Sequence, residues 1–301
     1  MNSYQTICAP PLPNVLAGQQ RIFHSSYGDI IYYVSGRGEA LLLVHGINLG
    51  ASVFEWRNNF SALDRCACVY ALDLIGFGMS EKRSMVYTAE IYMTVIREFI
   101  EAVVQEPVHI LASGLSAAYC SGIAYEFPQL VRSLMLVTPS GIGTNDGLPN
   151  DNSFSMFKLF TNPVQGEALY QAFASRQSIK YFLTEFIYAN PSNVTVGTVN
   201  YLFDAAHQCP NAQYAPASFI SGMSNYDVAP FFNEINKPML LIWGKKAKLG
   251  SYQYIDRFIE LNPQAQYYIF QDSAVNPQAE EYSQFNRLIL SFLENVMEGW
   301  S

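Results

Sequence analysis

Short apolar runs and helically spaced apolar residues alternate along residues 1–140 of the chain. Apolar runs of strand length occupy residues 29–34, 40–44, 67–74, 108–112 and 131–137. Residues 88–104 instead carry apolar side chains at the spacing of an amphipathic helix, with Thr88 as its expected N-cap, and residues 117–125 are predicted to form a second helix. Strands that alternate with helices in this way predict a mostly parallel sheet with helices on both faces.

A different pattern begins after residue 140. Residues 141–227 contain no pair of strand-like runs and are rich in Phe, Tyr, Asn and Pro, which predicts a helical insertion. The alternation then resumes, with strands predicted at 238–243 and 266–270 and helices at 252–261 and 280–297. We therefore expect an α/β core in two parts, residues 1–140 and 231–301, separated by a helical cap of residues 141–230.

Composition and charge exclude several classes of partner. The formal net charge is −8 and no basic run occurs, which argues against binding to nucleic acid or to anionic membranes. With four scattered His, no Cys/His cluster and no His-Glu-x-x-His motif, no metal is expected. Gly76 and Gly78 follow a predicted strand, but Glu81 stands where a dinucleotide-binding loop needs its third Gly, so no cofactor is expected either.

The cysteines and the N-terminus bear on location. Five Cys without a Cys-x-x-Cys pair predict a reduced, cytoplasmic protein. The first twenty residues lack a basic start followed by an apolar run, so no signal peptide is predicted, and no apolar stretch has the length of a transmembrane segment.

Four motifs occur in a fixed order along the core: LLLVHG, ALDLIGFGMS, the stretch VHILASGLSAAYCSGIAYEF, and KPMLLIWGKKA with YYIFQDSAV. Together they resemble the α/β-hydrolase superfamily, in its cap-bearing branch of esterases and epoxide hydrolases, and the resemblance spans residues 28–140 and 237–299. It implies a nucleophile on the turn after residues 108–112 and an acid and a base after the last two strands. It also implies an oxyanion hole formed by the backbone N–H groups of Ile47 and Leu115.

Two registers are possible for the nucleophile in the sequence ASGLSAA. One is centred on Gly114, and the other is centred on Ser116 and matches the pattern Gly-x-Ser-x-Ala. In the usual family sequence the strand begins six residues before the nucleophile and a Pro follows fourteen residues after it. Val108 and Pro128 stand at these distances from Gly114. This register is favoured, and it predicts that the nucleophile is replaced by glycine.

The acid and the base also fall on residues without a titratable side chain. The acid position after the strand predicted at residues 238–243 is Ala247, and the alternative position at residues 138–140 carries no carboxylate either. The base position is Val275, and the last His in the chain is His207. Loss of a whole triad leaves only binding and the oxyanion hole, which fall several kcal/mol short of an ordinary esterase.

These substitutions predict a pseudoenzyme that binds an apolar small molecule or a protein partner beneath the cap. Its expected ligand contacts are His45, Asn48, Ser113, Leu115 and Val275. Two alternatives stay open. One is a lyase, cyclase or isomerase that needs no triad and acts on an apolar substrate. The other is a residual serine hydrolase that uses Ser116.

Overall fold

The computed structural model describes residues 10–142 and 147–299, and its centre is a single eight-stranded sheet with the strand order β1-β2-β4-β3-β5-β6-β7-β8. The strands are β1 Gln19–Ser25, β2 Gly28–Gly36, β3 Ala40–Val44, β4 Cys68–Leu72, β5 Val108–Ser113, β6 Val131–Val137, β7 Met239–Gly244 and β8 Gln266–Phe270. β1, β2 and β4 pair antiparallel, and all later pairings are parallel. The mostly parallel sheet expected from the sequence is confirmed.

The edge strand β1 is the element that the apolar pattern missed. Most of its residues are exposed, so it lacks the alternation of apolar and polar positions that marks a half-buried strand. It is held by pairing with β2, in a register that runs from Gln19 opposite Val34 to Ser25 opposite Gly28. β1 and β2 form a hairpin, and backbone pairing at the edge of the sheet does not require apolar side chains on β1.

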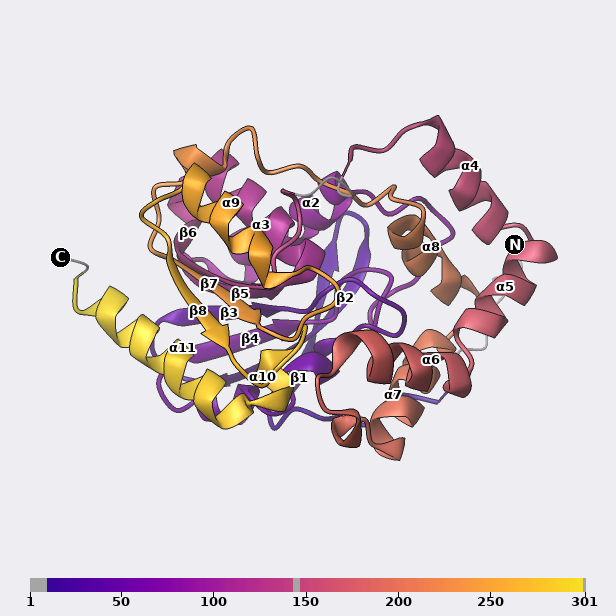
Figure 1. Ribbon diagram of the computed structural model, residues 1–301, viewed down its shortest axis with the longest axis horizontal. Helices are drawn as coiled ribbons and strands as arrows, with labels where there is room; N and C mark the ends of the chain where they lie inside the picture. The colour runs from indigo at the N-terminus through magenta and orange to yellow at the C-terminus, as the bar shows by residue number, and fades with distance from the viewer. Residues whose placement is uncertain (1–9, 143–146, 300–301) are drawn as a thin grey trace.

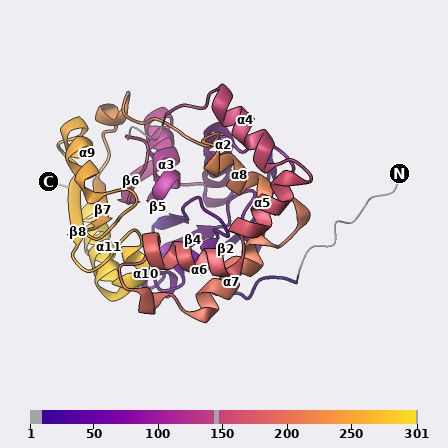
Figure 2. The ribbon, with the colours of Figure 1, turned by 45° about the vertical axis from the view of Figure 1, so that its right-hand side comes forward.

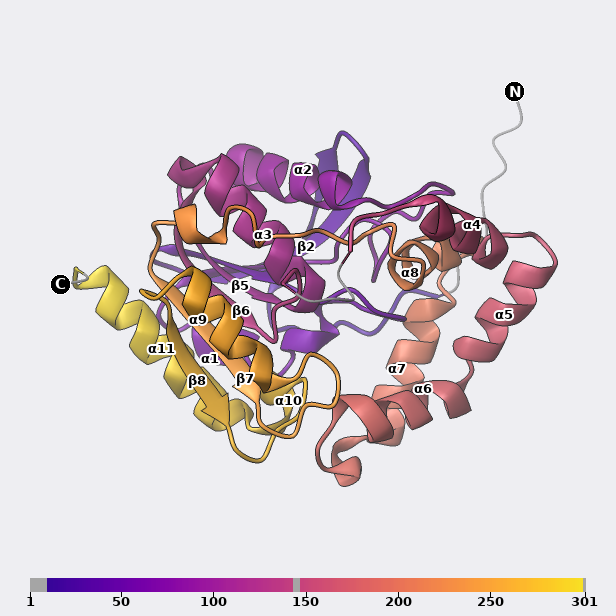
Figure 3. The same ribbon diagram turned by 45° about the horizontal axis from the view of Figure 1, so that its top comes forward.

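Helices cover both faces of the sheet (Figure 1). The helices α2 Ala89–Phe99, α3 Gly114–Glu126 and α9 Ile255–Leu261 contribute to one apolar cluster, and α1 Phe60–Leu63 and α11 Tyr282–Met297 to the other. Figure 3 shows the same layers from a second direction. The predicted N-cap is present, because the Thr88 hydroxyl accepts a hydrogen bond from the N–H of Ile91.

A group of helices connects β6 to β7 and lies to one side of the sheet (Figure 2). They are α4 Asp151–Phe160, α5 Gln165–Phe173, α6 Arg176–Phe182, α7 Val196–Ala206 and α8 Tyr214–Ile220. Within residues 147–230, every regular element is helical. α6 and α7 pack against Leu49, in the loop that follows β3. The division into core and cap at the stated boundaries stays a prediction.

Shorter helical segments complete the described chain. They are η1 Val53–Trp56, η2 Ile100–Val104, η3 Pro128–Leu130, η4 Leu183–Ile187, η5 Pro191–Asn193, η6 Pro210–Gln213, η7 Phe232–Glu234, η8 Tyr252–Tyr254 and α10 Pro277–Glu280. Two of them shape the region at the ends of the parallel strands, because η1 follows β3 and α10 follows β8. The two segments are in contact with each other.

Candidate active site

The turn between β5 and α3 has a backbone conformation that few residues adopt. Gly114 is the first residue of α3 and has a φ of 55°, in the left-handed region, whereas Ser113 before it is extended. A Cβ atom added to Gly114 would meet no atom within 4 Å. Glycine therefore relieves the strain of a sharp strand-to-helix turn and leaves open space where a side chain would project.

Ser116 lies in a different environment, one residue beyond Leu115 in the same helix. Its side chain is fully buried, and its hydroxyl donates a hydrogen bond of 2.6 Å to the carbonyl oxygen of His45. This hydroxyl would have to leave its partner before it could reach a substrate. The contact therefore counts against Ser116 as a nucleophile.

The side chain of His45 makes two hydrogen bonds within the chain. Its ring is fully buried; Nδ1 donates to the carbonyl oxygen of Gly46 over 2.8 Å, and Nε2 accepts from the N–H of Leu74 over 3.0 Å. Burial lowers the pKa of His45 to about 4, so the ring is neutral at pH 7. Both ring nitrogens are used inside the chain, and the ligand contact expected at His45 stays a prediction. Asn48, three residues later, is partly exposed.

The loops after β6 and β8 meet near the same turn. The hydroxyl of Thr138 donates to the carbonyl oxygen of Val275 over 3.1 Å, and the N–H of Ser140 donates to the carbonyl oxygen of Gly114 over 3.1 Å. The N–H of Val275 in turn donates to the carbonyl oxygen of Ile187, in the helical segment between β6 and β7. The structure thus brings Val275 into the neighbourhood of the β5–α3 turn through backbone contacts.

Ala247 lies on the loop after β7. Its N–H donates to the carbonyl oxygen of Gly244 over 3.2 Å, and its side chain is partly buried. Further along the same loop, a Cβ on Gly250 would lie 2.8 Å from a methyl carbon of Thr138, so this loop also approaches the end of β6. That Gly114, Ala247 and Val275 are the positions of a nucleophile, an acid and a base stays a prediction.

A carboxyl group that the sequence analysis did not consider lies at this end of the sheet. Glu55 in η1 accepts a hydrogen bond of 2.8 Å from the N–H of Gly46 and one of 2.7 Å from the side-chain amide of Gln278. Burial raises the pKa of Glu55, and hydrogen bonds from Ser113, Gly46 and Gln278 oppose the rise. These partners are far from Glu55 in sequence, so no local motif indicated it.

Ser113 is the residue through which Glu55 reaches the β5–α3 turn. It is buried, with 6% of its surface exposed. A Cβ on Gly46 would lie 2.9 Å from the Ser113 hydroxyl oxygen and 3.6 Å from Oε2 of Glu55. The absence of a side chain at Gly46 therefore lets the Ser113 hydroxyl and the Glu55 carboxyl approach the same point.

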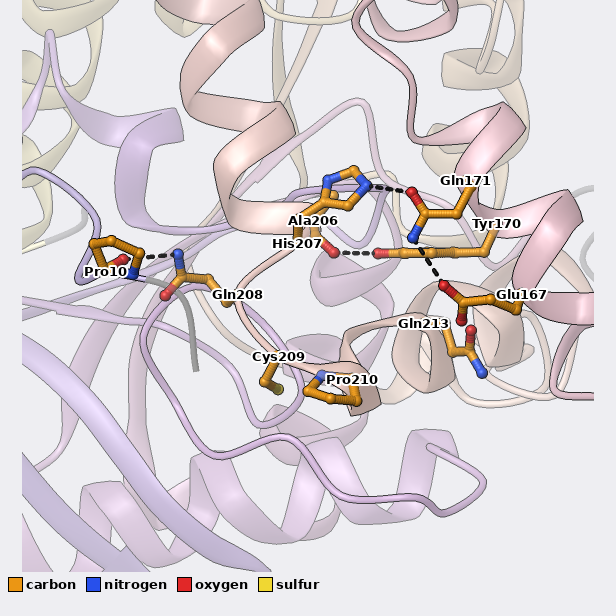
Figure 4. Close-up of a pocket in the computed structure, with 10 residues that line it drawn as sticks. All are labelled: Pro10, Glu167, Tyr170, Gln171, Ala206, His207, Gln208, Cys209, Pro210 and Gln213. Atoms are coloured by element: carbon orange, nitrogen blue, oxygen red, sulfur yellow. Dashed lines mark hydrogen bonds between the residues drawn. The ribbon is translucent and has the colours of Figure 1, made fainter. Parts of the chain in front are cut away.

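A separate pocket with a volume of about 650 Å³ lies among the helices between β6 and β7 (Figure 4). Its lining comes from Pro10, Glu167, Tyr170, Gln171, Ala206, His207, Gln208, Cys209, Pro210 and Gln213. The Nε2 atom of His207 lies 3.0 Å from the side-chain oxygen of Gln171, whose amide nitrogen donates to Glu167 over 2.9 Å. This pocket carries many polar groups and takes none of its lining from the β5–α3 turn.

Residues 10–142 and 147–299 contain neither a cluster of metal-ligand side chains nor a membrane-spanning helix. No group of three or more His, Cys, Asp and Glu side chains there could hold a metal ion. None of the helices in these ranges is both long and apolar enough to cross a bilayer.

Comparison with known proteins identifies the class of this chain. Residues 39–282 match the family described as the alpha/beta hydrolase fold, and the chain belongs to this family. It is 24% identical over 291 residues to a 2-hydroxy-6-oxo-6-phenylhexa-2,4-dienoate hydrolase from Comamonas testosteroni, with 88% of this chain and 91% of the relative aligned. A 2-hydroxy-6-oxononadienedioate/2-hydroxy-6-oxononatrienedioate hydrolase of the same species is 24% identical, over 87% and 90%.

A solved structure shows the same fold. The meta-cleavage product hydrolase CumD from Pseudomonas fluorescens IP01 superposes with a TM-score of 0.75 at 20% identity, and the match covers 91% of this chain and 97% of that one. At this identity the likeness establishes the fold alone.

These comparisons overturn the function predicted from the sequence. The prediction of a non-hydrolytic protein that binds an apolar molecule or a partner is wrong, because the relatives that align with nearly the whole chain are named as hydrolases. The absence of three catalytic side chains from their expected positions does not by itself exclude a hydrolytic reaction. The hydrolase alternative agrees better with the relatives.

Proposed function

We propose that this protein is a hydrolase that cleaves a bond next to a carbonyl group, at the open space above Gly114. The names of the aligned relatives support the reaction type, since their substrates carry an oxo group at carbon 6. Hydrolysis beside a ketone and hydrolysis of an ester share one requirement. An oxygen nucleophile must add to the carbonyl carbon, and the oxygen that becomes negative must be stabilised.

The neighbouring strands β3 and β5 support an oxyanion hole formed by the backbone N–H groups of Ile47 and Leu115. Val44 lies opposite Ala112 in the parallel register, and Ile47 and Leu115 each follow three residues later. Leu115 is the second residue of the 13-residue helix α3, where backbone N–H groups lack partners within the helix and the helix dipole favours negative charge. Removal of one such donor costs roughly 100- to 1,000-fold in kcat in enzymes of this kind.

We also propose that Gly114, Ala247 and Val275 occupy the positions at which relatives carry their nucleophile, acid and base. Under this proposal, none of the three side chains can transfer a proton. The reaction then needs a hydroxyl and a base from elsewhere at the same end of the sheet.

The observation that carries the proposal is the left-handed Gly114 with open space beside it. The test is turnover of p-nitrophenyl acetate and of 2-hydroxy-6-oxo-6-phenylhexa-2,4-dienoate, measured with wild type, Gly114→Ala and Gly114→Phe. We expect wild-type turnover above the uncatalysed rate and a loss of at least tenfold in Gly114→Phe, because phenylalanine fills the space. Gly114→Ala separates the effect of backbone strain from that of filling.

Gly147→Phe is a matched control. A Cβ on Gly147 also meets no atom within 4 Å, but this glycine is an exposed residue before α4. Its turnover should equal that of wild type. A folded wild-type protein that turns over neither substrate would refute the proposal, as would a Gly114→Phe variant with full activity.

A further inference from the structure

We propose that Ser113 and Glu55 are the catalytic pair of this site, with the Ser113 hydroxyl as the nucleophile and the Glu55 carboxylate as its base. The inference rests on the proposed function. It assigns the proton transfer to two residues that no motif indicates and that take the place of a serine–histidine pair.

The closeness of the two side chains to one point is the first support. A Cβ on Gly46 would lie 2.9 Å from the Ser113 hydroxyl oxygen and 3.6 Å from Oε2 of Glu55, and an interaction with Ser113 opposes the rise in the pKa of Glu55. Ser113 directly precedes Gly114, the residue that borders the open space. A nucleophile beside a base is the arrangement that covalent catalysis requires.

Two further donors hold the Glu55 carboxyl in place. The N–H of Gly46 binds Oε2, and the side-chain amide of Gln278 binds Oε1. Gln278 is fully buried, and its backbone carbonyl oxygen accepts a hydrogen bond of 3.1 Å from the side-chain amide of Asn59. Gln278 is therefore a positioning residue, which orients the base as the acid of a triad orients its histidine.

The chemistry balances with an ester as substrate. The Ser113 oxygen forms a bond to the carbonyl carbon while its proton passes to Glu55, and the Ile47 and Leu115 N–H groups stabilise the oxyanion. Collapse breaks the bond to the leaving alcohol, which takes the proton from Glu55. Water then adds to the acyl carbon and gives a proton to Glu55. The bond to Ser113 breaks, its oxygen regains that proton, and the acid leaves.

The electrostatics of Glu55 agree with this role. Burial raises the pKa of its carboxyl. A carboxylate with a raised pKa is a stronger base, and general bases work best when their pKa lies near the working pH. Ser116 has no comparable partner, because its hydroxyl donates to a backbone carbonyl oxygen, which is not a base.

The test combines labelling with kinetics on the full chain. Wild type, Ser113→Ala and Glu55→Gln are treated with a fluorophosphonate probe, and the labelled peptide is identified by mass spectrometry. We expect labelling at Ser113 in wild type and at least a hundredfold slower labelling in Glu55→Gln. The kcat for p-nitrophenyl acetate should fall at least a hundredfold in both variants, the scale of general-base catalysis.

Ser121→Ala is the matched control. Ser121 is a buried serine of α3 whose hydroxyl donates within the helix, to the carbonyl oxygen of Ala117 over 2.9 Å. This variant should keep the wild-type rates. Thermal melting verifies that each variant is folded, and Glu55→Asp, which keeps the carboxylate, should recover part of the activity that Glu55→Gln loses.

The outcomes separate the two proposals. A wild-type protein that hydrolyses its substrates while Glu55→Gln keeps its rate within threefold overturns the catalytic pair and leaves the hydrolase function standing. Labelling at Ser116 overturns the pair in the same way. A folded wild-type protein that neither turns over substrate nor reacts with the probe overturns both.

Discussion

Two loops at the ends of β4 and β5, the strands on either side of β3, each place a glycine with nearly the same φ but in opposite surroundings. Gly78, in the loop after β4, has a φ of 49°, and Gly114, in the turn after β5, has a φ of 55°. A Cβ on Gly78 would overlap the carboxyl group of Asp73, whereas a Cβ on Gly114 would meet nothing within 4 Å. The first glycine closes a packed loop, and the second leaves room for another molecule.

Two carboxyl groups near these loops, those of Asp73 and Glu55, differ in their hydrogen-bond partners. Asp73 accepts hydrogen bonds of 2.8 Å from the backbone N–H groups of Val53 and Met79. Glu55 accepts from one backbone N–H group, and its other partners are the side chains of Gln278 and Ser113. Burial raises the pKa of both carboxyls, so a raised pKa does not distinguish the structural group from the proposed catalytic one. Their partners do.

The largest effect should follow from a methyl group at the packed glycine. Gly78→Ala places a Cβ against a carboxyl that two backbone N–H groups hold in position, and it adds left-handed strain. We expect the free energy of unfolding in urea to fall by about 4 kcal/mol, in the range of severe steric substitutions. Gly147→Ala, at an exposed open site, should change it by less than about 0.5 kcal/mol. Equal losses in the two variants would contradict the difference in packing.

Most strands of the sheet could be predicted from the sequence, whereas part of the candidate site could not. Strand-like runs and their order predicted β2 to β8 because parallel strands are buried along most of their length and read as apolar runs. Family spacing favoured Gly114 at the sharp turn, and the structure has a left-handed residue there. Glu55 escaped notice because its partners lie in three segments, at Gly46, Ser113 and Gln278, that only the folded chain brings together.

The pH dependence of stability tests the carboxyl group of Asp73, which lies beside the packed loop. Asp73 has a pKa raised from 3.8 to about 6, mainly by burial, so its neutral form is favoured in the folded state. Its contribution to stability is therefore fully present below pH 3.8 and is lost as the pH rises through about 6. Loss of this shift should amount to about 3 kcal/mol, at about 1.4 kcal/mol per pKa unit. Unfolding of wild type and Asp73→Asn in urea at pH 4 and pH 7 measures it.

The informative quantity is the difference in unfolding free energy between wild type and Asp73→Asn. A second group, His45, changes the stability of both proteins in the opposite direction with pH. His45 has a pKa lowered to about 4 by burial, so its contribution is fully present above pH 6.5 and is lost as the pH falls toward 4. The two slopes partly cancel in wild type. We expect wild type to gain about 2 kcal/mol relative to Asp73→Asn between pH 7 and pH 4, because unfolded Asp73 is already partly ionised at pH 4. A difference that is independent of pH would show that the Asp73 carboxyl is not perturbed.

A smaller effect is expected at the open glycine. Gly114→Ala meets no steric conflict, so only the cost of a left-handed alanine remains, about 1 kcal/mol. Urea unfolding of this variant beside Gly78→Ala sharpens the comparison, because the two positions share their φ and differ in their surroundings. A loss at Gly114 as large as that at Gly78 would mean that the space above the β5–α3 turn is filled.

The smallest change in stability should come from the residue with the largest expected effect on activity. Glu55→Gln replaces the carboxyl group of a partly exposed residue by an amide, which keeps its size and one oxygen acceptor for the N–H of Gly46. Gln278 can compensate for the change. Its side-chain oxygen is buried without a hydrogen-bond partner among the described residues, and a half-turn of its amide would direct that oxygen toward the new amide at position 55. The free energy of unfolding should therefore stay within about 1 kcal/mol of wild type, since a lost charged contact is replaced by a satisfied neutral one. Unfolding of wild type and Glu55→Gln in urea measures this. A loss of about 3 kcal/mol or more would place Glu55 with Asp73 among the structural carboxyls, and the fall in activity expected for Glu55→Gln would then have a structural explanation.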